Sequence, residues 1–292
     1  MHYRHRRDQS LTSDPLEQFA PQGTASGPLL SIITVCLNAA ATIADTLASV
    51  SMQETDFVLE HLCIDGGSRD ATCEIIDRWA GRSSRIRTIY ERDAGIYDAM
   101  NKGLRAARGE YVLFLNADDF LVSPHTLATA MQGIIPAAES NPDLIVGDAV
   151  MGILGKRGFW RHRRVPRRLG RIPGSGWYPV HQGQFTKRRL LEAVGGFDAR
   201  RRLASDLIQY YDIEMNCRPS IRRLGADVAF MQSGGAANAG PMAVIRGSAE
   251  IFRHLSAQRG FLRACAMLSI KTLQSLGEIR YGCCPNKRWF IG

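Results

Sequence analysis

The sequence predicts an α/β fold built on a mostly parallel, doubly wound sheet. From residue 29 to residue 115, short apolar runs typical of buried strands alternate with segments that have apolar residues at helical spacing. Each apolar run ends at or just before an Asn or Asp. With 292 residues, 45% of them apolar, the chain is long enough to bury a sizeable core.

The expected elements follow one another in a regular order. Strands are predicted at 29–37, 58–64, 85–90 and 111–115, and helices at 39–50, 71–79 and 95–107. Ser68 is a candidate N-cap of the second helix, and Gly109 ends the third. Before the first strand, residues 1–28 are rich in polar residues, Pro and Gly, so we expect a disordered leader.

Polar side chains lie at the ends of all four strands: Asn38, Asp65, Asp93 and the stretch Asn116 to Asp118. Ligands of open α/β sheets bind at the carboxyl ends of the strands, so we expect these side chains to line one crevice. A single one is more often a helix cap than a ligand, but four strand ends at once are poorly explained by capping.

The stretch Asn116-Ala117-Asp118-Asp119 follows a fully apolar strand. Hard oxygen ligands at a strand end suit Mg²⁺ or Mn²⁺ carrying a phosphate. The alternative is a polar turn in which Asp119 or Ser123 caps the next helix.

Several classes of protein are disfavoured by the sequence. It contains neither the spaced glycines of a dinucleotide fingerprint nor a Walker lysine loop. The charged N-terminus lacks the apolar segment of a signal peptide, and no stretch of about 18 uncharged apolar residues predicts a transmembrane helix. The seven cysteines lack metal-ligand spacing and indicate a reduced, cytosolic protein.

Charge is distributed unevenly along the chain. Residues 29–150 contain 9 Lys/Arg and 17 Asp/Glu, whereas residues 151–292 contain 25 and 8. The segment 156–171 carries eight basic residues and no acid, and its glycines and prolines predict a mobile loop. Nucleic acid, anionic lipid, a phosphorylated substrate or simple solvation could each explain this segment.

Taken together, five motifs make the chain resemble the family 2 glycosyltransferases, whose nucleotide-sugar-binding fold is called GT-A. The motifs are SIITVCLNAAATI, HLCIDGGSRDAT, ERDAGIYDAMNKGLRAARGEYVLFLNADD, PVHQGQF and GGFDARRRLASD. The resemblance covers residues 29–235, with a donor nucleotide-binding half at 29–120 and an acceptor half at 121–235. It implies an inverting enzyme that transfers a sugar from a nucleotide-sugar donor to an acceptor.

The resemblance also implies roles for individual residues. The residues expected along the donor are Thr34, Val35, Asn38, Asp65, Asp93, Asn101, Lys102, Asn116 and Ala117. Asp118 would hold a divalent cation, Mg²⁺ or Mn²⁺, directly. Asn116 replaces the first Asp of the family's metal-binding motif, and as a neutral, poorer ligand it would contact ribose or a metal-bound water.

On the acceptor side the resemblance assigns the general base to Asp206, which follows the Gly-Gly-Phe-Asp turn at 195–198. His181 and Gln182 would face the acceptor or the diphosphate, and Trp177 offers a flat face for a sugar.

Residues 236–292 predict a basic, helical C-terminal extension, with apolar and basic residues interleaved between 242 and 282. Such helices can lie in a membrane interface or can pack against the catalytic domain. Because lipid-linked acceptors are common in this family's polysaccharide assembly, we expect a lipid-linked saccharide acceptor and peripheral attachment to the cytoplasmic face of the membrane. The product would be a cell-surface polysaccharide or glycolipid.

Two other classes compete with an enzyme. A nucleic-acid-binding module would explain the basic segment, but the acidic first half would repel phosphate backbones, so we expect no nucleic acid partner. A catalytically inactive protein of the same fold would leave the presence of both Asp118 and Asp206 unexplained.

Overall fold

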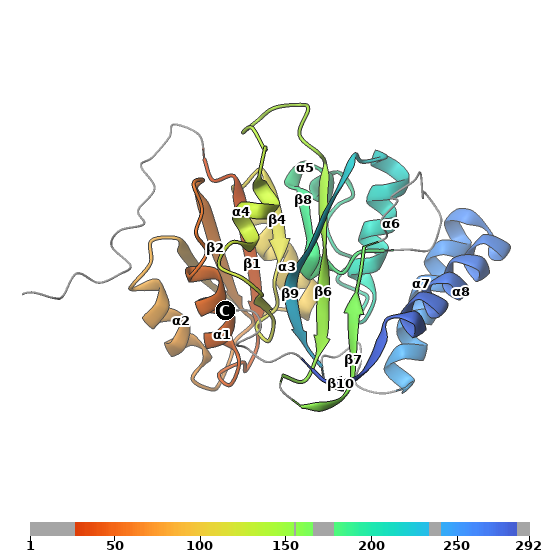
Figure 1. Ribbon diagram of the computed structural model, residues 1–292, viewed down its shortest axis with the longest axis horizontal. Helices are drawn as coiled ribbons and strands as arrows, with labels where there is room; N and C mark the ends of the chain where they lie inside the picture. Colours follow the sequence, from red (N-terminus) through yellow and green to blue (C-terminus); the bar gives the residue numbers. More distant parts are fainter. Residues whose placement is uncertain (1–26, 155, 166–177, 234–240, 285–292) are drawn as a thin grey trace, which may run out of the picture.

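The computed structural model describes residues 27–154, 156–165, 178–233 and 241–284 (Figure 1). Its strands are β1 (Leu30–Cys36), β2 (Leu59–Asp65), β3 (Ile86–Tyr90), β4 (Tyr111–Phe114), β5 (Phe120–Leu121), β6 (Leu144–Gly152), β7 (Arg157–Arg163), β8 (Gln184–Lys187), β9 (Ile221–Gln232) and β10 (Ile279–Cys283). Its helices are α1 (Ile43–Ser51), α2 (Thr72–Ala80), α3 (Ile96–Ala106), α4 (Thr126–Met131), the 3₁₀ turn η2 (His181–Gly183), α5 (Arg188–Ala193), α6 (Ser205–Cys217), α7 (Pro241–Arg259) and α8 (Phe261–Gly277).

One sheet runs through the whole molecule in the order β10-β7-β6-β8-β4-β1-β2-β3, and β9 pairs with both β5 and β6. In the first half, β1 is parallel to both β2 and β4, and β2 is parallel to β3. The predicted α/β fold class is therefore confirmed. The second half of the sheet is more mixed, because β8, β6, β7 and β10 pair with their neighbours in antiparallel fashion.

Helices cover both faces of the parallel half, as a doubly wound sheet requires. Side chains alternate along a strand, so the odd and even residues of β1 face opposite sides. Ile33 and Val35 pack in the same cluster as α3 and α6, whereas Leu30 and Ile32 pack in the same cluster as α4. Burial on both faces also explains why β1, β2 and β4 are buried along their whole length and are largely apolar.

The strands and helices predicted up to residue 115 are all present, with small shifts at their ends. The largest shift is in the first helix, which begins at Ile43; the backbone N–H of Ala39, before it, donates to Thr72 Oγ1 at the start of α2. Ser68 is not a helix cap. Helix α2 begins four residues later, and Ser68 Oγ instead accepts a hydrogen bond from the Asn38 N–H.

Two predictions for the second half were wrong. Residues 157–163 of the basic segment form strand β7 rather than a loop, and residues 279–283 form strand β10 rather than the end of a helix. Each of these strands supplies the other's backbone partners, since β10 pairs with β7 along its length. Such pairing between distant segments is decided by tertiary context rather than by local pattern. Arg167 and Arg168 of the same basic segment lie outside the described residues.

Helices α7 and α8 form a hairpin at the end of the molecule opposite α2 (Figure 1). Gly260, with a φ of 81°, makes the turn between them in a conformation that favours glycine. Ile251, Leu255, Ala264 and Met267 of the hairpin are buried in the same core cluster as α6. Within the described ranges, no helix is both long and apolar enough to cross a membrane.

Candidate active site

A cavity of about 800 Å³ opens at the carboxyl ends of β1 and β4 and extends to α6, α7 and α8. It receives side chains from both halves of the chain. Eight of the residues predicted from the sequence line it: Val35, Asn38, Asn116, Ala117, Asp118, His181, Gln182 and Asp206. The expectation that one crevice would collect distant strand-end residues therefore holds for Asn38 and the stretch after β4.

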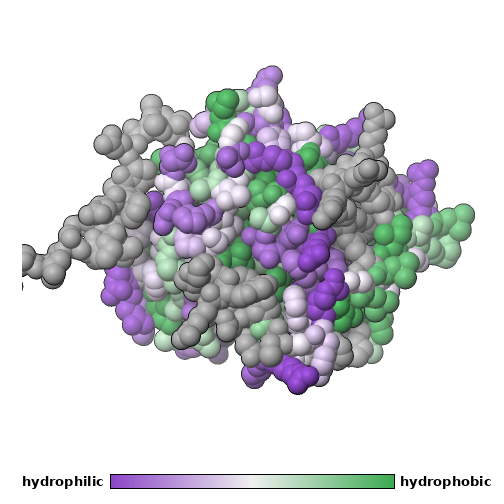
Figure 2. All heavy atoms as spheres, viewed as in Figure 1, coloured by the Kyte–Doolittle hydropathy of each residue, from purple (hydrophilic) through white to green (hydrophobic). Residues whose placement is uncertain are grey.

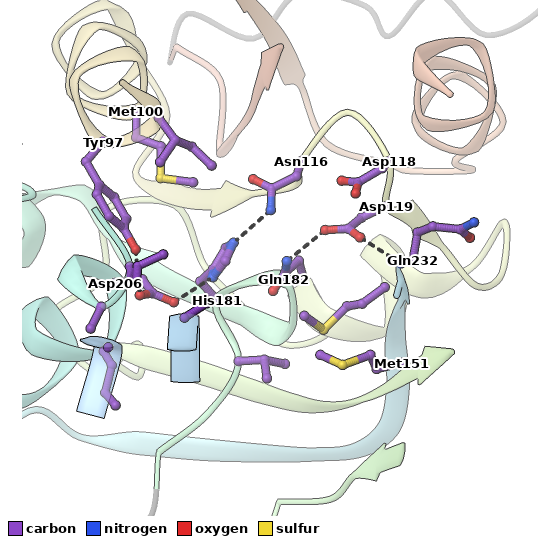
Figure 3. A pocket seen from close by; sticks show the side chains of 18 of the residues that line it. Tyr97, Met100, Asn116, Asp118, Asp119, Met151, His181, Gln182, Asp206 and Gln232 are labelled. Carbon is purple, nitrogen blue, oxygen red and sulfur yellow. Dashed lines mark hydrogen bonds and ion pairs between the residues drawn. The ribbon is translucent and has the colours of Figure 1, made fainter. Parts of the chain in front are cut away.

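The turn after β4 places two adjacent carboxylates at the cavity wall (Figure 3). Asp118 is partly exposed, and burial raises the pKa of its carboxyl. Asp119 is 3% exposed, and burial together with the charge of Asp118 raises its pKa to about 7. Two carboxylates held this close favour the arrival of a cation.

Asp119 has a structural role in this turn. One of its oxygens accepts a hydrogen bond from Gln182 Nε2 at 2.7 Å and the other from the Gln232 N–H at 3.2 Å. The next helix, α4, begins after His125, whose side chain makes no capping hydrogen bond. Asp119 therefore ties the turn to η2 and β9 and does not cap the helix, and Asp118 is the carboxylate left to face the cavity.

A chain of polar contacts links the turn to Asp206 (Figure 3). Asn116 Nδ2 lies 3.4 Å from His181 Nε2, and His181 Nδ1 lies 3.2 Å from Asp206 Oδ2. A neutral imidazole with its proton on Nδ1 satisfies both contacts, because Asn116 then donates to Nε2 while Nδ1 donates to the carboxylate. An ionised aspartate at position 116 could not donate this hydrogen bond. The asparagine that replaces the family's aspartate therefore allows the contact with His181.

Asp206 stands at the first turn of α6 and is held from two sides. The hydroxyl of Tyr97, on α3, donates to Asp206 Oδ1 at 3.0 Å, and His181 donates to Oδ2. Burial alone would raise the pKa of Asp206, but the hydrogen bonds that its carboxylate accepts from His181, the Leu207 N–H and Tyr97 outweigh burial, so the pKa lies below its usual value. The carboxylate is therefore ionised at neutral pH and can accept a proton.

Tyr97 was missed in the sequence, where only the other apolar positions of its helix were singled out. Burial and the nearby charge of Asp206 raise the pKa of Tyr97, which keeps it a phenol that donates its proton. The only available signal was its place inside the motif ERDAGIYDAMNKG, because a tyrosine near the start of a helix otherwise indicates packing.

Asp65 and Asp93 do not line the cavity. Asp65 is 1% exposed, and its Oδ1 accepts hydrogen bonds from the N–H groups of Gly67 and Ser68 at 2.9 and 2.8 Å. Asp93 lies beside the neighbouring Gly66, since a Cβ on Gly66 would be 2.0 Å from Asp93 Oδ2. Asp65 thus ends β2, Asp93 follows β3, and both acids lie outside the cavity lining.

Thr34, Lys102 and Asn101, which were also predicted to contact the sugar donor, bind other residues of the protein instead. Thr34 is fully buried, and its hydroxyl lies 2.9 Å from His61 Nε2. Lys102 forms an ion pair with Glu91 at 2.9 Å.

Asn101 binds both the N–H and the C=O of Phe197, each at 2.8 Å. It therefore fixes the Gly-Gly-Phe-Asp turn that precedes α6. Of the predicted acceptor-side residues, Trp177 lies outside the described residues.

The cavity also contains cations that the sequence did not assign to it: Arg161 and Arg163 from β7, Arg202, and Lys271 from α8. Arg163 forms an ion pair with Glu278 at 3.0 Å, and its guanidinium lies 4.8 Å from the centre of the Tyr178 ring. The run of basic residues at 156–171 indicated that positive charge lies here. Because this run was predicted to be a loop, however, the sequence did not show which of its arginines face the site.

The residues after β4 fit a divalent cation. Asp118 offers a carboxylate, and Asn116 Oδ1 is buried and accepts no hydrogen bond from any described residue. These are the oxygen ligands that Mg²⁺ and Mn²⁺ prefer.

A separate group, Asp148, His162 and Asp227, has atoms spaced as metal ligands are. Its side chains already have protein partners, however, within the group or beside it. His162 Nε2 lies 2.7 Å from Asp227, Asp148 accepts from the Val165 N–H, and Arg223 lies 3.9 Å from Asp148. This group is better explained as a network between strands.

Comparison with known proteins gives a consistent result. Residues 31–206 match the family model described as glycosyl transferase family 2. The chain is also 33% identical over 198 residues to the PGL/p-HBAD biosynthesis glycosyltransferase of Mycobacterium bovis, an alignment that covers 66% of this chain and 70% of that protein.

Among solved structures, TarS 1-349 of S. aureus in complex with UDP-GlcNAc has a TM-score of 0.55 at 18% identity, covering 85% of this chain and 72% of that one. The chain covers 43% of the longer solved TarS chain. The mannosyltransferase PcManGT of Pyrobaculum calidifontis, in complex with GDP-Man and Mn²⁺, has a TM-score of 0.57 at 19% identity, covering 89% and 79%. These similarities show a shared fold.

The contact between His181 and Asp206 leads to a prediction about the carboxyl pKa. His181→Leu removes a hydrogen bond that lowers this pKa and leaves the burial that raises it, so the pKa of Asp206 should rise. The pH titration of its carboxyl carbon by ¹³C NMR, assigned with Asp206→Asn, measures the shift. His125→Leu, at an exposed histidine outside the cavity, is the control. An unchanged titration in His181→Leu would contradict the role given to His181.

Proposed function

The chain belongs to glycosyl transferase family 2, and from this premise we propose that it is an inverting enzyme that transfers a sugar from a nucleotide-diphosphate donor to a lipid-linked saccharide. One observation carries the proposal: Asp118 and Asp206, the two acids for which the family's chemistry has a use, line the same cavity. His181 and Asn116 link Asp206 to the turn that carries Asp118. The donor would lie on the side of Asp118, and the acceptor on the side of Asp206.

In the proposed reaction, Asp206 is the general base. An acceptor hydroxyl attacks the anomeric carbon of the donor sugar, its proton passes to the carboxylate of Asp206, and the bond from that carbon to the diphosphate oxygen breaks. The carboxylate of Asp206 offers about four lone-pair sites, and the hydrogen bonds from Tyr97, His181 and the Leu207 N–H use three of them, so one remains for the acceptor's proton. A single displacement on the face opposite the leaving group inverts the anomeric centre.

Asp118, with Asn116 beside it, would hold a divalent cation at the donor's diphosphate. Such an ion stabilises the negative charge that develops on the leaving phosphate. Asp119 and Gln182 support this position by fixing the turn on which Asp118 stands. PcManGT was solved with Mn²⁺, which makes Mn²⁺ a suitable ion for a first test.

The C-terminal hairpin supports an acceptor that resides at a membrane. Its apolar side chains divide into two sets, one in the core and one exposed. The exposed set is Met242, Val244, Ile245, Phe261, Leu262, Ile270, Leu273 and Leu276. Figure 2 shows hydrophobic surface over this end of the molecule.

Arg246, Arg253 and Arg263 are exposed on the same two helices. Apolar side chains flanked by basic ones suit the interface of a membrane with anionic headgroups. Because Val244 and Leu276 also line the cavity, the active site would open beside that membrane surface.

The first test concerns Asp118. Asp118→Asn removes the charged ligand of the cation, so divalent-dependent donor binding and turnover should be lost while the protein stays folded, because this partly exposed acid contributes little to the core. Calorimetric titration with UDP and GDP, with and without Mn²⁺, and thermal unfolding measure these effects. Full activity of wild type in EDTA would contradict the metal-assisted reaction.

The second test concerns Asp206. Asp206→Asn is nearly isosteric but cannot take the acceptor's proton, so kcat should fall by about 10²- to 10⁴-fold while donor affinity stays close to wild type. Steady-state kinetics and donor titration separate the two quantities. An equal loss of donor affinity would place Asp206 in the donor site instead.

The third test concerns the membrane. Reversal of Arg246, Arg253 and Arg263 to Glu should release the protein from anionic liposomes at low salt, because each Lys or Arg near such a surface contributes about 1 kcal/mol. The matched control reverses three exposed arginines of the first half, Arg78, Arg82 and Arg105. If both triple variants sediment with liposomes as wild type does, the hairpin is not the membrane contact.

A further inference from the structure

Strand geometry sorts the basic residues of β7 onto two faces. Successive side chains of a strand point in opposite directions, so Arg161 and Arg163 share one face and His162 occupies the other. Both arginines line the cavity, whereas His162 bonds to Asp227. The basic run therefore delivers two of its charges into the active site.

Lys271 of α8 joins these arginines from a segment more than 100 residues away in sequence. It also lines the cavity and is partly buried. Burial, followed by the charge of Arg163, lowers the pKa of Lys271; the charge of Asp206 opposes this shift, and that of Arg161 adds to it. Arg161, Arg163 and Asp206 therefore lie close enough to act on Lys271. Burial raises the pKa of Glu278, and the charges of Arg163 and Arg161 oppose that rise.

Two of these cations lack a partner that would explain their position. Arg163 is neutralised by Glu278, but no carboxylate lies within ion-pair distance of Arg161 or Lys271 among the residues that the structure describes. Of the segments that the structure does not describe, 166–177, 234–240 and 285–292 contain no Asp or Glu, whereas residues 1–26 contain Asp8, Asp14 and Glu17. Like charges held together in a partly buried site are unfavourable unless an anion joins them.

The position of these cations separates them from the donor end of the cavity. Asp206 is the acid whose charge acts on Lys271, whereas the charged group that acts on Asp118 is His181. Figure 3 shows Asp118 and Asp206 on opposite sides of His181. The cations thus lie beyond the base, where the acceptor would be bound, and the exposed apolar residues Val244 and Leu276 form the adjoining rim.

We propose that Arg161 and Lys271 form an anion subsite that binds a phosphate group of the acceptor, next to the sugar whose hydroxyl faces Asp206. A planar guanidinium and an ammonium supply several donors to phosphate oxygens, and two positive charges that form no ion pair with a described carboxylate suit a phosphate or diphosphate better than a single carboxylate. An apolar chain attached to that phosphate would leave along the rim. The inference rests on the proposed function, because it takes the Asp206 side of the cavity as the acceptor side.

The test measures anion binding without turnover. Pyrophosphate and a short-chain alkyl diphosphate are titrated by calorimetry into wild type, Arg161→Met and Lys271→Met, all in EDTA so that no divalent ion holds an anion at Asp118. Loss of one charged hydrogen-bond donor should weaken binding about 10- to 100-fold. Tighter binding of the alkyl diphosphate than of pyrophosphate would support a lipid-linked phosphate, whereas equal binding would support the phosphate subsite without the lipid chain.

Two variants serve as matched controls. Arg157→Met removes a cation from the same strand, and Arg253→Met removes an exposed one from the neighbouring helix α7; neither residue lines the cavity. Both should bind the two anions as wild type does. Thermal unfolding checks that the cavity variants remain folded, and Arg161→Lys, which keeps the charge, should bind more tightly than Arg161→Met.

A second titration distinguishes the acceptor subsite from a donor subsite. With Mn²⁺ present, UDP and GDP should bind Arg161→Met and Lys271→Met as tightly as wild type. If nucleotide affinity falls as far as diphosphate affinity, the cations hold the donor and the proposal is overturned. It is also overturned if wild type binds pyrophosphate no better than the cavity variants. Normal anion binding in an enzyme whose Asp206→Asn variant retains full turnover would instead contradict only the proposed role of the base.

Discussion

The hydrogen bonds that the Asp206 carboxylate accepts hold the elements of the site together. Asp206 is charged and partly buried, and its ionised form is favoured because Tyr97 and His181 donate to its two oxygens. These three residues come from α3, η2 and α6, so the contact joins segments that are 109 and 25 residues apart. Without the two donors, burial would raise the pKa of the acid and leave it a poor base at neutral pH. The packing of α3 against α6 is therefore a chemical requirement of the site as well as part of the core.

Charge is partitioned across the cavity in the same way as along the chain. The first half has a net charge of −8 (9 Lys/Arg and 17 Asp/Glu) and supplies Asp118, whereas the second half has a net charge of +17 (25 and 8) and supplies Arg161, Arg163 and Lys271. A divalent ion with its diphosphate suits the acidic side, and an anionic group suits the basic side. The cavity thus has an acidic and a basic side, which in the proposed reaction would receive the two substrates, with Asp206 between them.

The second half of the sheet makes this partition possible. Strand β10 returns from the C-terminal hairpin to pair with β7, which places α8 next to the strand that carries the arginines. The alternation of β7 then turns Arg161 and Arg163 toward the cavity and His162 toward a separate network with Asp227. A loop with the same composition would not have sorted these charges.

The sequence by itself determined the parallel half of the sheet and the acids at its edge. Apolar runs and helical spacing are local patterns, so the elements between residues 29 and 115 could be predicted, and a strand that ends in Asn-Ala-Asp-Asp marks the edge where ligands bind. The motif after the Gly-Gly-Phe-Asp turn likewise directed attention to Asp206. Only the tertiary structure decided which side chains reach the cavity. Thr34 and Lys102, expected at the donor, have partners elsewhere.

Tyr97, Arg161 and Lys271, which were not assigned to the site from the sequence, line the cavity. The physical reason is that a side chain's partner depends on which distant strand or helix packs against it. The spacing of residues along one segment carries no record of that packing.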